Sequence, residues 1–317
     1  MGPRQTPPPL PELEANMMVV GDPAVRTTLN NYNWVQAIEN NMDTSHNGIL
    51  HFGAVSPENA LAADSGFDED IRYLVGDRAP RFEVRDTDFG CTYGAFRDTD
   101  DGRVYWRTMH WLFPFYSMSP VPKLGTSAIF GATVPVDDNH CMGWSMARTD
   151  SGFVPPFPPQ SGSSRRPLSN TSDWLGRFRN SLWEIADKDF EIDRDLQRAK
   201  PANVTGFTGM RDINTQDEAM RWSQGRADNS GIVDRIKEHL CAADAMIIRF
   251  RNRLLEAAKA LAVDGTAPPG VDNPEAYRVR SGWIILPKNV DWWEASSEAR
   301  DAFKRDLAPT TPVLPGS

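Results

Sequence analysis

The sequence predicts an α+β domain, and two observations lead to that prediction. Five short segments between residues 81 and 147 are rich in Phe, Tyr, Trp, Val and Thr and are separated by turns such as Asp-Thr-Asp-Asp-Gly, which is typical of antiparallel strands. On both sides of them, apolar residues recur every three or four positions, as in amphipathic helices. Helices that flank a run of strands indicate an α+β fold in which a long helix packs on one face of the sheet.

The N-terminal part of the chain is expected to contain a linker and then a helix. Residues 1–24 begin with a proline-rich stretch, which favours an extended, semi-rigid segment. Residues 25–46 are expected to be helical because they contain apolar residues at three- and four-residue spacing. The residues that carry this spacing are Trp34, Val35, Ile38 and Met42.

The sheet and the elements after it follow from the same two periodicities. Strands are expected at 81–84, 92–96, 104–111, 126–136, 141–147 and 282–286, and a long surface loop rich in Pro, Ser and Gly at 150–172. Helices are expected at 174–187 and, as the most sustained one, at 232–262. The apolar face of that long helix comprises Ile232, Ile236, Leu240, Met246, Ile247, Phe250, Leu254 and Leu255.

Composition excludes several classes of function. The 317 residues carry 34 Lys and Arg against 43 Asp and Glu, and a net charge of −9 argues against nucleic acid or anionic membrane as a partner. Apolar runs are too short to span a membrane. The 3 cysteines are isolated, which is typical of a reducing compartment. We therefore expect a cytoplasmic, globular protein.

Histidine is scarce, yet two of the 5 histidines occur in the pattern Asp43-x2-His46-x4-His51. On an ideal helix His46 and His51 would point about 140° apart, since each residue advances the helix by about 100°. The helix must distort or end for both imidazoles to reach one point. We expect Gly48, which is permissive in its backbone angles, to allow this.

A metal site with two histidines needs a third ligand from elsewhere in the chain. Asp217 is the best candidate, because Thr215 and Glu218 resemble a capping box that would place it in the first turn of a helix. Two imidazoles and one carboxylate on one face of an iron ion leave positions open for dioxygen and substrate. From these residues alone, a metal site and ordinary structural polar residues both remain open.

The remaining histidines have simpler interpretations. We expect His110 and His140 to serve the sheet and His239 to be a structural residue on the long helix, and none of the three to be a metal ligand.

The stretch from Asn33 to His51 resembles the iron-binding helix of Rieske non-haem iron aromatic ring-hydroxylating oxygenases, α subunit, and in particular the phthalate dioxygenase-like branch with its Q-A-x-E-x-x-x-D-x-S-H-x-x-x-x-H pattern. Other motifs of this family follow in the expected order along nearly the whole chain. They are residues 134–138, 189–194, 207–209, 216–217, 223–225, 234–235 and 238–240. A short insertion at 226–231 departs from the family pattern.

This resemblance implies a fold, a domain organisation and a set of site residues. The fold would be the helix-grip α+β catalytic domain (TBP-like or START-like), with the antiparallel sheet wrapped on a long C-terminal helix. Residues 1–24 would be the linker from an N-terminal Rieske domain absent from this sequence, 25–308 the mononuclear iron catalytic domain, and 309–317 a flexible tail. His46, His51 and Asp217 would bind Fe(II), and Asp43 would be the electron-transfer bridge to a neighbouring subunit.

The resemblance also implies the reaction and the partners. The reaction would be O2 activation at Fe(II), with hydroxylation or O-demethylation of an aromatic substrate. Partners would be a reductase or ferredoxin as electron donor and further copies of the chain in a homotrimer. The [2Fe-2S] cluster would come from the missing Rieske domain or another chain, because no cysteine here has a histidine two or three residues on. The alternatives are a non-catalytic hydrophobic-ligand-binding helix-grip domain and, more weakly supported, a zinc hydrolase.

Overall fold

The computed structural model describes residues 4–17, 24–52, 71–121, 123–125, 129–147, 183–199, 208–210, 213–225 and 232–301. The loop expected at 150–172, the insertion at 226–231 and the tail at 309–317 lie outside these residues, as does most of the helix expected at 174–187.

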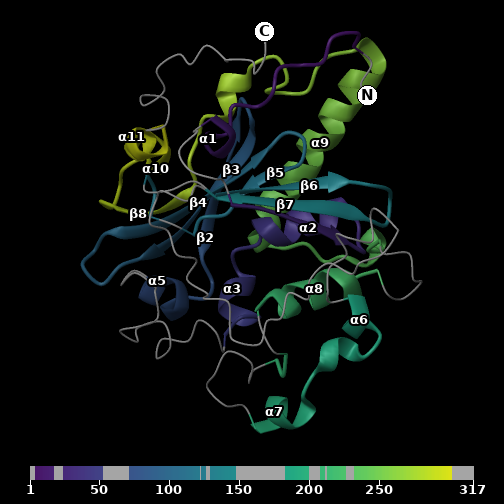
Figure 1. Ribbon diagram of the computed structural model, residues 1–317. Helices are drawn as coiled ribbons and strands as arrows, with labels where there is room; N and C mark the ends of the chain where they lie inside the picture. The colour runs from purple at the N-terminus through teal and green to yellow at the C-terminus, as the bar shows by residue number, and fades with distance from the viewer. Residues whose placement is uncertain are drawn as a thin grey trace.

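One antiparallel sheet organises the described part of the chain (Figure 1). Seven of its 8 strands follow the order β1-β7-β6-β5-β4-β3-β2, and the eighth, β8, pairs with β4 beside this path. Strands β5 and β8 both pair with β4. Strand β5 pairs with residues 110–112 of β4, and β8 pairs with residues 104–108. The strands are β1 Ala24–Asn30, β2 Arg81–Thr87, β3 Gly90–Asp98, β4 Val104–Leu112, β5 Tyr116–Met118, β6 Ile129–Pro135, β7 Cys141–Ala147 and β8 Gly282–Leu286.

The α+β prediction is confirmed, and each expected strand has a counterpart in the sheet. The helix predicted at 25–46 is wrong in its first part, because residues 24–30 form strand β1. A helix is present in the second part, where α2 covers Trp34–Met42. Strand β1 pairs with β7, for example Thr27 with Trp144. The β-branched residues of β1 fit a strand, and the pairing partner lies too far along the chain for the local pattern to reveal it.

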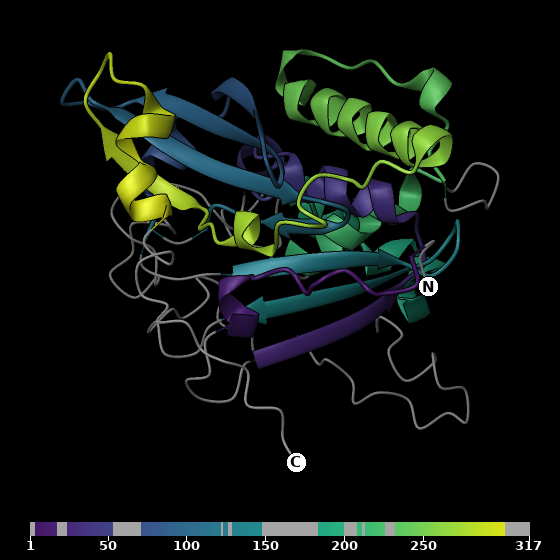
Figure 2. The same ribbon diagram turned by 90° about the horizontal axis from the view of Figure 1, so that it is seen from above.

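The hydrophobic core lies between the sheet and two helices, α2 and α9 (Ala245–Asp264), which contact each other and the sheet (Figure 2). Asn33 caps α2 by accepting the N–H of Val35 at 2.9 Å. From α2, α9, β3 and β4, this core collects fully buried side chains: Ile38, Met42, Tyr93, Met109, Trp111 and Phe250.

The opposite face of the sheet is covered by a tryptophan stack. Trp106 of β4 and Trp292 of α10 (Trp292–Ala295) lie with ring centroids 5.4 Å apart at an interplanar angle of 20°. Gly94 of β3 lies beneath them, and a Cβ there would approach the Trp106 ring to 2.7 Å. Glycine is therefore required at this position for the stack to approach the strand.

The long helix predicted at 232–262 begins later than expected, at Ala245. Before it, the chain forms two short 3-10 turns, η3 Arg235–Lys237 and η4 Ala242–Asp244. Ile236, predicted to lie on the apolar face, is 95% exposed, and Ile232 and Leu240 are also exposed. Ion pairs rather than apolar contacts fix this segment, and they join Glu39, Arg235, Glu238 and Arg251.

The first described segment packs against the body of the protein. It ends in α1 (Glu14–Met17), where Leu13 and Glu14 are buried. The Glu14 carboxylate accepts two hydrogen bonds from Arg280, at 2.6 and 2.7 Å. Part of the stretch predicted to be a linker is thus tied to the segment that leads into β8.

The remaining described helices are short apart from α8, and they lie around the ends of the sheet (Figure 1). No described helix is long and apolar enough to cross a membrane. These helices are α3 His46–Ile49, α5 Ile71–Gly76, α6 Trp183–Ala186, η2 Asp189–Glu191, α7 Arg194–Ala199, α8 Ile213–Ser223, η5 Pro274–Tyr277 and α11 Ser297–Arg300.

Candidate metal centre

The structure brings His46, His51 and Asp217 together. Asp217 Oδ1 lies 3.2 Å from His51 Nε2 and 3.6 Å from His46 Nε2. One potential ligand atom from each of the three side chains lies within 4.8 Å of the other two, and no other such cluster occurs among the described residues. The two imidazole rings stand nearly perpendicular, at 81°, with centroids 4.9 Å apart. Such a trio can hold one cation between two nitrogens and one carboxylate oxygen.

The two histidines flank a short helix, α3, which begins at His46 and ends at Ile49, two residues before His51. A corner precedes α3, because α2 ends at Met42 and the next residue, Asp43, has extended backbone angles (φ −77°, ψ 107°). The Asp43 side chain accepts the N–H of Ser45 at 2.7 Å and stabilises this corner. The helix thus ends between the two histidines, as expected, but Gly48 lies inside α3, one residue before its last residue. A Cβ there would approach the Arg78 side chain to 3.0 Å, so close packing accounts for the glycine.

A hydrogen-bond chain fixes the orientation of the buried His51 ring. His51 Nδ1 lies 2.7 Å from Gln216 Oε1, and Gln216 Nε2 donates to Thr208 Oγ1 at 2.9 Å. Because the amide nitrogen already donates to Thr208, the amide oxygen faces His51 and the ring donates from Nδ1. Nε2 then carries the lone pair and faces Asp217. The sequence analysis quoted Gln216 only as a motif residue, and its position beside Asp217 gave no signal of this role.

Two polar atoms of the cluster are buried without a hydrogen-bond partner among the described residues, namely Asp217 Oδ1 and His46 Nδ1. Burying an unpaired carboxylate oxygen is unfavourable unless a cation neutralises it. The donor set, two imidazole nitrogens and one carboxylate oxygen, is the facial arrangement that suits Fe(II) in oxygenases. The residues present therefore fit a mononuclear iron.

Burial and mutual contacts shift the pKa values of the trio in different directions. Burial lowers the pKa of His46, and the charges of Asp217 and Asp43 only partly oppose it. Burial also acts to lower the pKa of His51, but its interactions with Asp217 and Gln216 outweigh burial and raise the pKa. For Asp217, burial acts to raise the pKa, but the close contact with His51 and the positive charge of Arg221 lower it overall. The carboxylate is therefore ionised and ready to bind a cation.

Asp217 lies in the second turn of α8 rather than the first, so the predicted capping box is wrong. Thr215 and Glu218 are both buried inside the helix. Glu218 Oε1 accepts from the Tyr32 hydroxyl at 2.9 Å and from Arg221 Nη1 at 3.0 Å. Burial raises the pKa of Glu218, while Arg221 and Tyr32 oppose that rise. Contacts with the rest of the fold, not a cap, thus position Asp217.

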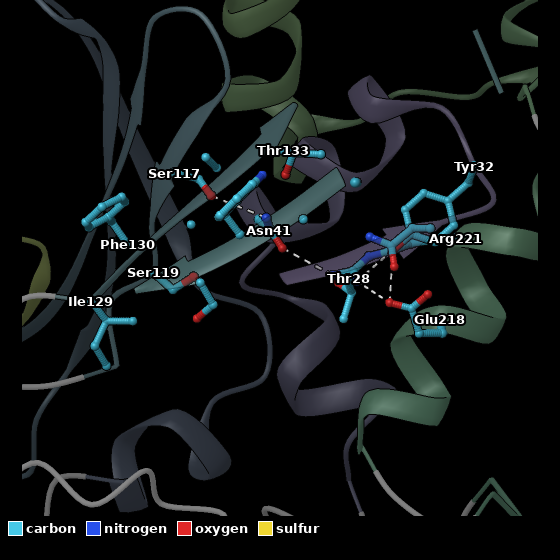
Figure 3. Close-up of a pocket in the computed structure, with 17 residues that line it drawn as sticks. Thr28, Tyr32, Asn41, Ser117, Ser119, Ile129, Phe130, Thr133, Glu218 and Arg221 are labelled. Carbon is cyan, nitrogen blue, oxygen red and sulfur yellow. Dashed lines mark hydrogen bonds and ion pairs between the residues drawn. The ribbon is translucent and has the colours of Figure 1, made fainter. Parts of the chain in front are cut away.

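A cavity of about 250 Å³ lies between the sheet and helices α2 and α8, the helix before Asp43 and the helix that carries Asp217 (Figure 3). Strands β1, β5, β6 and β7 supply the opposite wall. Arg221 Nη2 donates to Asn41 Oδ1 at 3.2 Å and links the two helices across one end.

Asp43 lies on the solvent side of the metal cluster. Its side chain is 34% exposed, and its Oδ2 is 3.7 Å from His46 Nδ1, which is longer than a hydrogen bond. The carboxylate is thus close to one histidine and reachable from outside.

The other histidines lie away from the cluster. His110 is buried in β4, contacts Thr92 and the carbonyl of Arg280, and burial lowers its pKa to about 3. His140 contacts Asp137 in the surface turn between β6 and β7, in agreement with a structural role in the sheet. His239 is exposed in the segment before α9, so its predicted place on the long helix is wrong.

The family model described as LigXa C-terminal domain like matches residues 22–311. The chain belongs to this family. The LigXa-type domain is 34% identical to the 3-chlorobenzoate-3,4-dioxygenase oxygenase subunit of Comamonas testosteroni, over 96% of this chain and 69% of the relative. It is 27% identical to the phthalate 4,5-dioxygenase oxygenase subunit of Pseudomonas putida, over 82% of this chain and 56% of the relative.

A structure of dicamba monooxygenase bound to 3,6-dichlorosalicylic acid matches 80% of this chain and 64% of that chain, with 12% identity and a TM-score of 0.39. The relatives are oxygenase subunits, so the resemblance to Rieske oxygenases is confirmed and the enzyme interpretation is supported over the ligand-binding alternative. The family implies a mononuclear iron in this LigXa-type domain. The chain spans 69% and 56% of the length of the two relatives named above.

Proposed function

We propose that this domain activates O2 at one Fe(II) bound by His46, His51 and Asp217 and oxygenates an aromatic compound, by hydroxylation or O-demethylation. The observation that carries the proposal is the convergence of the three side chains, with a buried Asp217 oxygen that has no hydrogen-bond partner among the described residues. The aromatic compounds in the names of the relatives, 3-chlorobenzoate and phthalate, support an aromatic substrate.

The residues around the metal have separate tasks in this proposal. Iron bound by only three protein groups keeps positions open for dioxygen, and this is the chemistry the metal supplies. Gln216 keeps His51 in the tautomer that presents Nε2, and ligand orientation of this kind strengthens metal binding. The cavity between the sheet, α2 and α8, the helix that carries Asp217, is proposed to hold the aromatic ring.

Asp43 is proposed to carry the electron into the site. Its side chain is 34% exposed and its Oδ2 lies 3.7 Å from His46 Nδ1, which supports a route from a neighbouring subunit through Asp43 to His46. We propose that the electron comes from a [2Fe-2S] cluster outside these residues, fed by a reductase or ferredoxin, in a homotrimer of the full-length protein. The motivation is the absence from this sequence of any Cys-x-His or Cys-x2-His pair.

Anaerobic titration with Fe(II) tests the ligand assignment. The chain should bind one Fe(II), and His46→Ala and Asp217→Ala should each bind it far more weakly. His239→Ala is the matched control, because His239 is exposed and remote from the cluster, and it should bind iron like the unchanged chain. Equal iron uptake by all four proteins would show that these side chains are not the ligands.

A further inference from the structure

We propose that Arg221 is a positioning residue for the metal site. It ties α8, which carries Asp217, to the end of α2, which precedes the two histidines. The inference rests on the proposed function in taking these three side chains as the metal ligands. It deepens that function by assigning a residue outside the ligand set that fixes how ligands from two separate segments lie relative to each other.

The metal cluster depends on the relative position of two helices. His46 and His51 follow α2, whereas Asp217 lies on α8. Such a ligand set keeps its geometry only while the helices stay in place, because displacements of about half an ångström already matter at a metal site. Side chains do not fill the space between α2, α8 and the sheet, where the cavity of about 250 Å³ lies. Polar contacts across this space therefore contribute directly to the position of α8.

Arg221 makes such contacts from the helix that carries Asp217, and it lies one helical turn after that ligand. Its Nη2 donates to Asn41 Oδ1 at 3.2 Å (Figure 3). Its carbonyl accepts from Gln36 Nε2 at 3.3 Å. Both partners belong to α2, and Asn41 comes directly before Met42, the last residue of that helix. The bond to Asn41 therefore holds α8 close to the corner that leads to the histidines.

Both ends of the bond between Arg221 and Asn41 are themselves held in place. Arg221 Nη1 donates to Glu218 Oε1 at 3.0 Å, and the Tyr32 hydroxyl donates to the same oxygen at 2.9 Å. On the other side, Asn41 Nδ2 donates to Ser117 Oγ of β5 at 3.3 Å. Because neither side chain is free to swing, a bond between them can fix the distance between the two helices.

The planar guanidinium suits this task, because its two Nη atoms donate to different partners in a fixed geometry. One Nη atom reaches Glu218 within α8, and the other reaches Asn41 on α2. A lysine ammonium would keep the positive charge without this fork. The alternative is that Arg221 only neutralises the buried Glu218 carboxylate, and in that case the bond to Asn41 would not affect the metal site.

Asn41→Ala separates these two roles, because it removes the bond between the helices and leaves the ion pair of Arg221 with Glu218 in place. Anaerobic titration should show Fe(II) binding about tenfold weaker than in the unchanged chain, the lower end of the range for groups that orient metal ligands. Co(II) bound in place of Fe(II) has a visible absorption spectrum that depends on ligand geometry, and this spectrum should also change. Asn40→Ala, the same change one position earlier on α2, is the matched control and should alter the affinity by less than about twofold.

Arg221→Lys is the second variant, because it keeps the charge beside Glu218 and loses the fork. It should weaken Fe(II) binding by at least about tenfold and change the Co(II) spectrum as well. The proposal is overturned if Asn41→Ala binds Fe(II) as tightly as the unchanged chain and gives the same Co(II) spectrum, even if its stability to urea falls. If Asn41→Ala does not fold, the same comparison with Arg221→Lys decides.

Failure of this inference is distinguishable from failure of the proposed function. Equal affinities in the variants and the unchanged chain would overturn the role of Arg221, while one Fe(II) bound by the unchanged chain would still support the ligand assignment. If the unchanged chain bound no Fe(II), the proposed function would be overturned and this inference with it.

Discussion

The tautomer of His51 is decided by one amide group. If Gln216 were absent, either ring nitrogen of His51 could carry the proton, and in half of the arrangements a proton would point at Asp217 instead of a lone pair pointing at a metal. The hydrogen bond of 2.7 Å from Nδ1 to Gln216 removes this freedom. Thr208 in turn fixes the amide, so three side chains from separate segments define one lone pair.

Replacing Gln216 with leucine should weaken Fe(II) binding by about 10- to 100-fold, the range measured when such outer partners of metal-binding histidines are removed. The ligands themselves are unchanged in Gln216→Leu, so one Fe(II) should still bind at saturation. Asn214→Ala, an exposed change on the same helix, is the control for general effects on α8. An unchanged affinity in Gln216→Leu would show that the Nδ1 hydrogen bond does not organise the site.

The affinity for Fe(II) should fall on acidification. The fall should begin at a higher pH than the pH at which an ordinary histidine side chain becomes protonated. A histidine must be neutral to bind metal, so protons compete with iron. The pKa of His51 is raised, so its proton competes at higher pH than that of a free histidine, whose pKa is about 6.5. The pKa of His46 is lowered, so His46 contributes little to this competition.

Below the pKa of His51, one competing proton implies a loss on the order of tenfold in affinity per pH unit. Anaerobic Fe(II) titrations between pH 5.5 and 8 measure the curve. An affinity that stays constant down to pH 6 would contradict the raised pKa of His51.

The candidate ligands could be predicted from sequence, whereas the groups that position them could not. Asp43, His46 and His51 lie in one short pattern, and a metal needs a third ligand whose residue type is known in advance. By contrast, the hydrogen bond from Tyr32 to Glu218 joins residues 186 positions apart. Neither residue type indicates the other, so the sequence alone cannot predict this contact.

Among the secondary-structure elements, strands were predicted better than helix boundaries. The aromatic and β-branched segments of the sheet alternate with strong turn residues, and both signals are local. The segment before α9 was misassigned because Ile232, Ile236 and Leu240 repeat at helical spacing. Asp234 instead accepts the N–H of Ile236 and starts a short 3-10 turn, and ion pairs hold the following residues. The spacing of apolar residues alone cannot show whether a segment packs as an amphipathic helix or is held by caps and ion pairs.

The N-terminal segment should contribute to stability through one buried ion pair. Glu14 and Arg280 are 0% and 6% exposed, so Glu14→Gln leaves a buried guanidinium without its counter-ion and should lower the free energy of unfolding by about 3–5 kcal/mol. Urea unfolding measures the change. Asp272→Asn removes the partner of Arg4 in an exposed pair, and it should leave the urea midpoint unchanged. If both variants unfolded like the unchanged chain, the segment would not be docked in solution.

At the scale of the whole molecule, the site exists only because the sheet brings distant segments together. His51 and Gln216 are 165 positions apart, and the cavity wall joins α2, α8 and four strands. Helix α2 packs on the sheet, on α8 and on α9. A shift of the core side chains would therefore also move the C-terminal end of α2 and the corner at Asp43 that follows it. A mutation in the core below α2 should therefore disturb metal binding, whereas one in the Trp106–Trp292 stack on the opposite face should not.

The proposed separation between the iron site and the source of its electrons leads to a final prediction. The 317 residues contain no Cys-x-His or Cys-x2-His pair, so a reductase and NADH alone should give no product from an aromatic substrate. Hydrogen peroxide is dioxygen that has already received two electrons and two protons, so it can convert an aromatic C–H to a phenol with release of water and without another reductant. The iron-loaded chain should therefore form product with peroxide.

Asp43→Asn separates these two regimes. If Asp43 carries electrons, the variant should keep the peroxide-driven rate within about twofold, because that reaction needs no electron from outside. In a longer protein that includes a [2Fe-2S] domain, the same variant should lose NADH-driven turnover. Only that reaction depends on electron transfer from the cluster through Asp43 to the iron. Product formation measured by chromatography decides both cases. Turnover of the 317-residue chain with NADH and a reductase alone would show that electrons reach the iron without a cluster. A large loss of the peroxide reaction in Asp43→Asn would show that Asp43 supports the iron site itself and does not act in electron delivery alone.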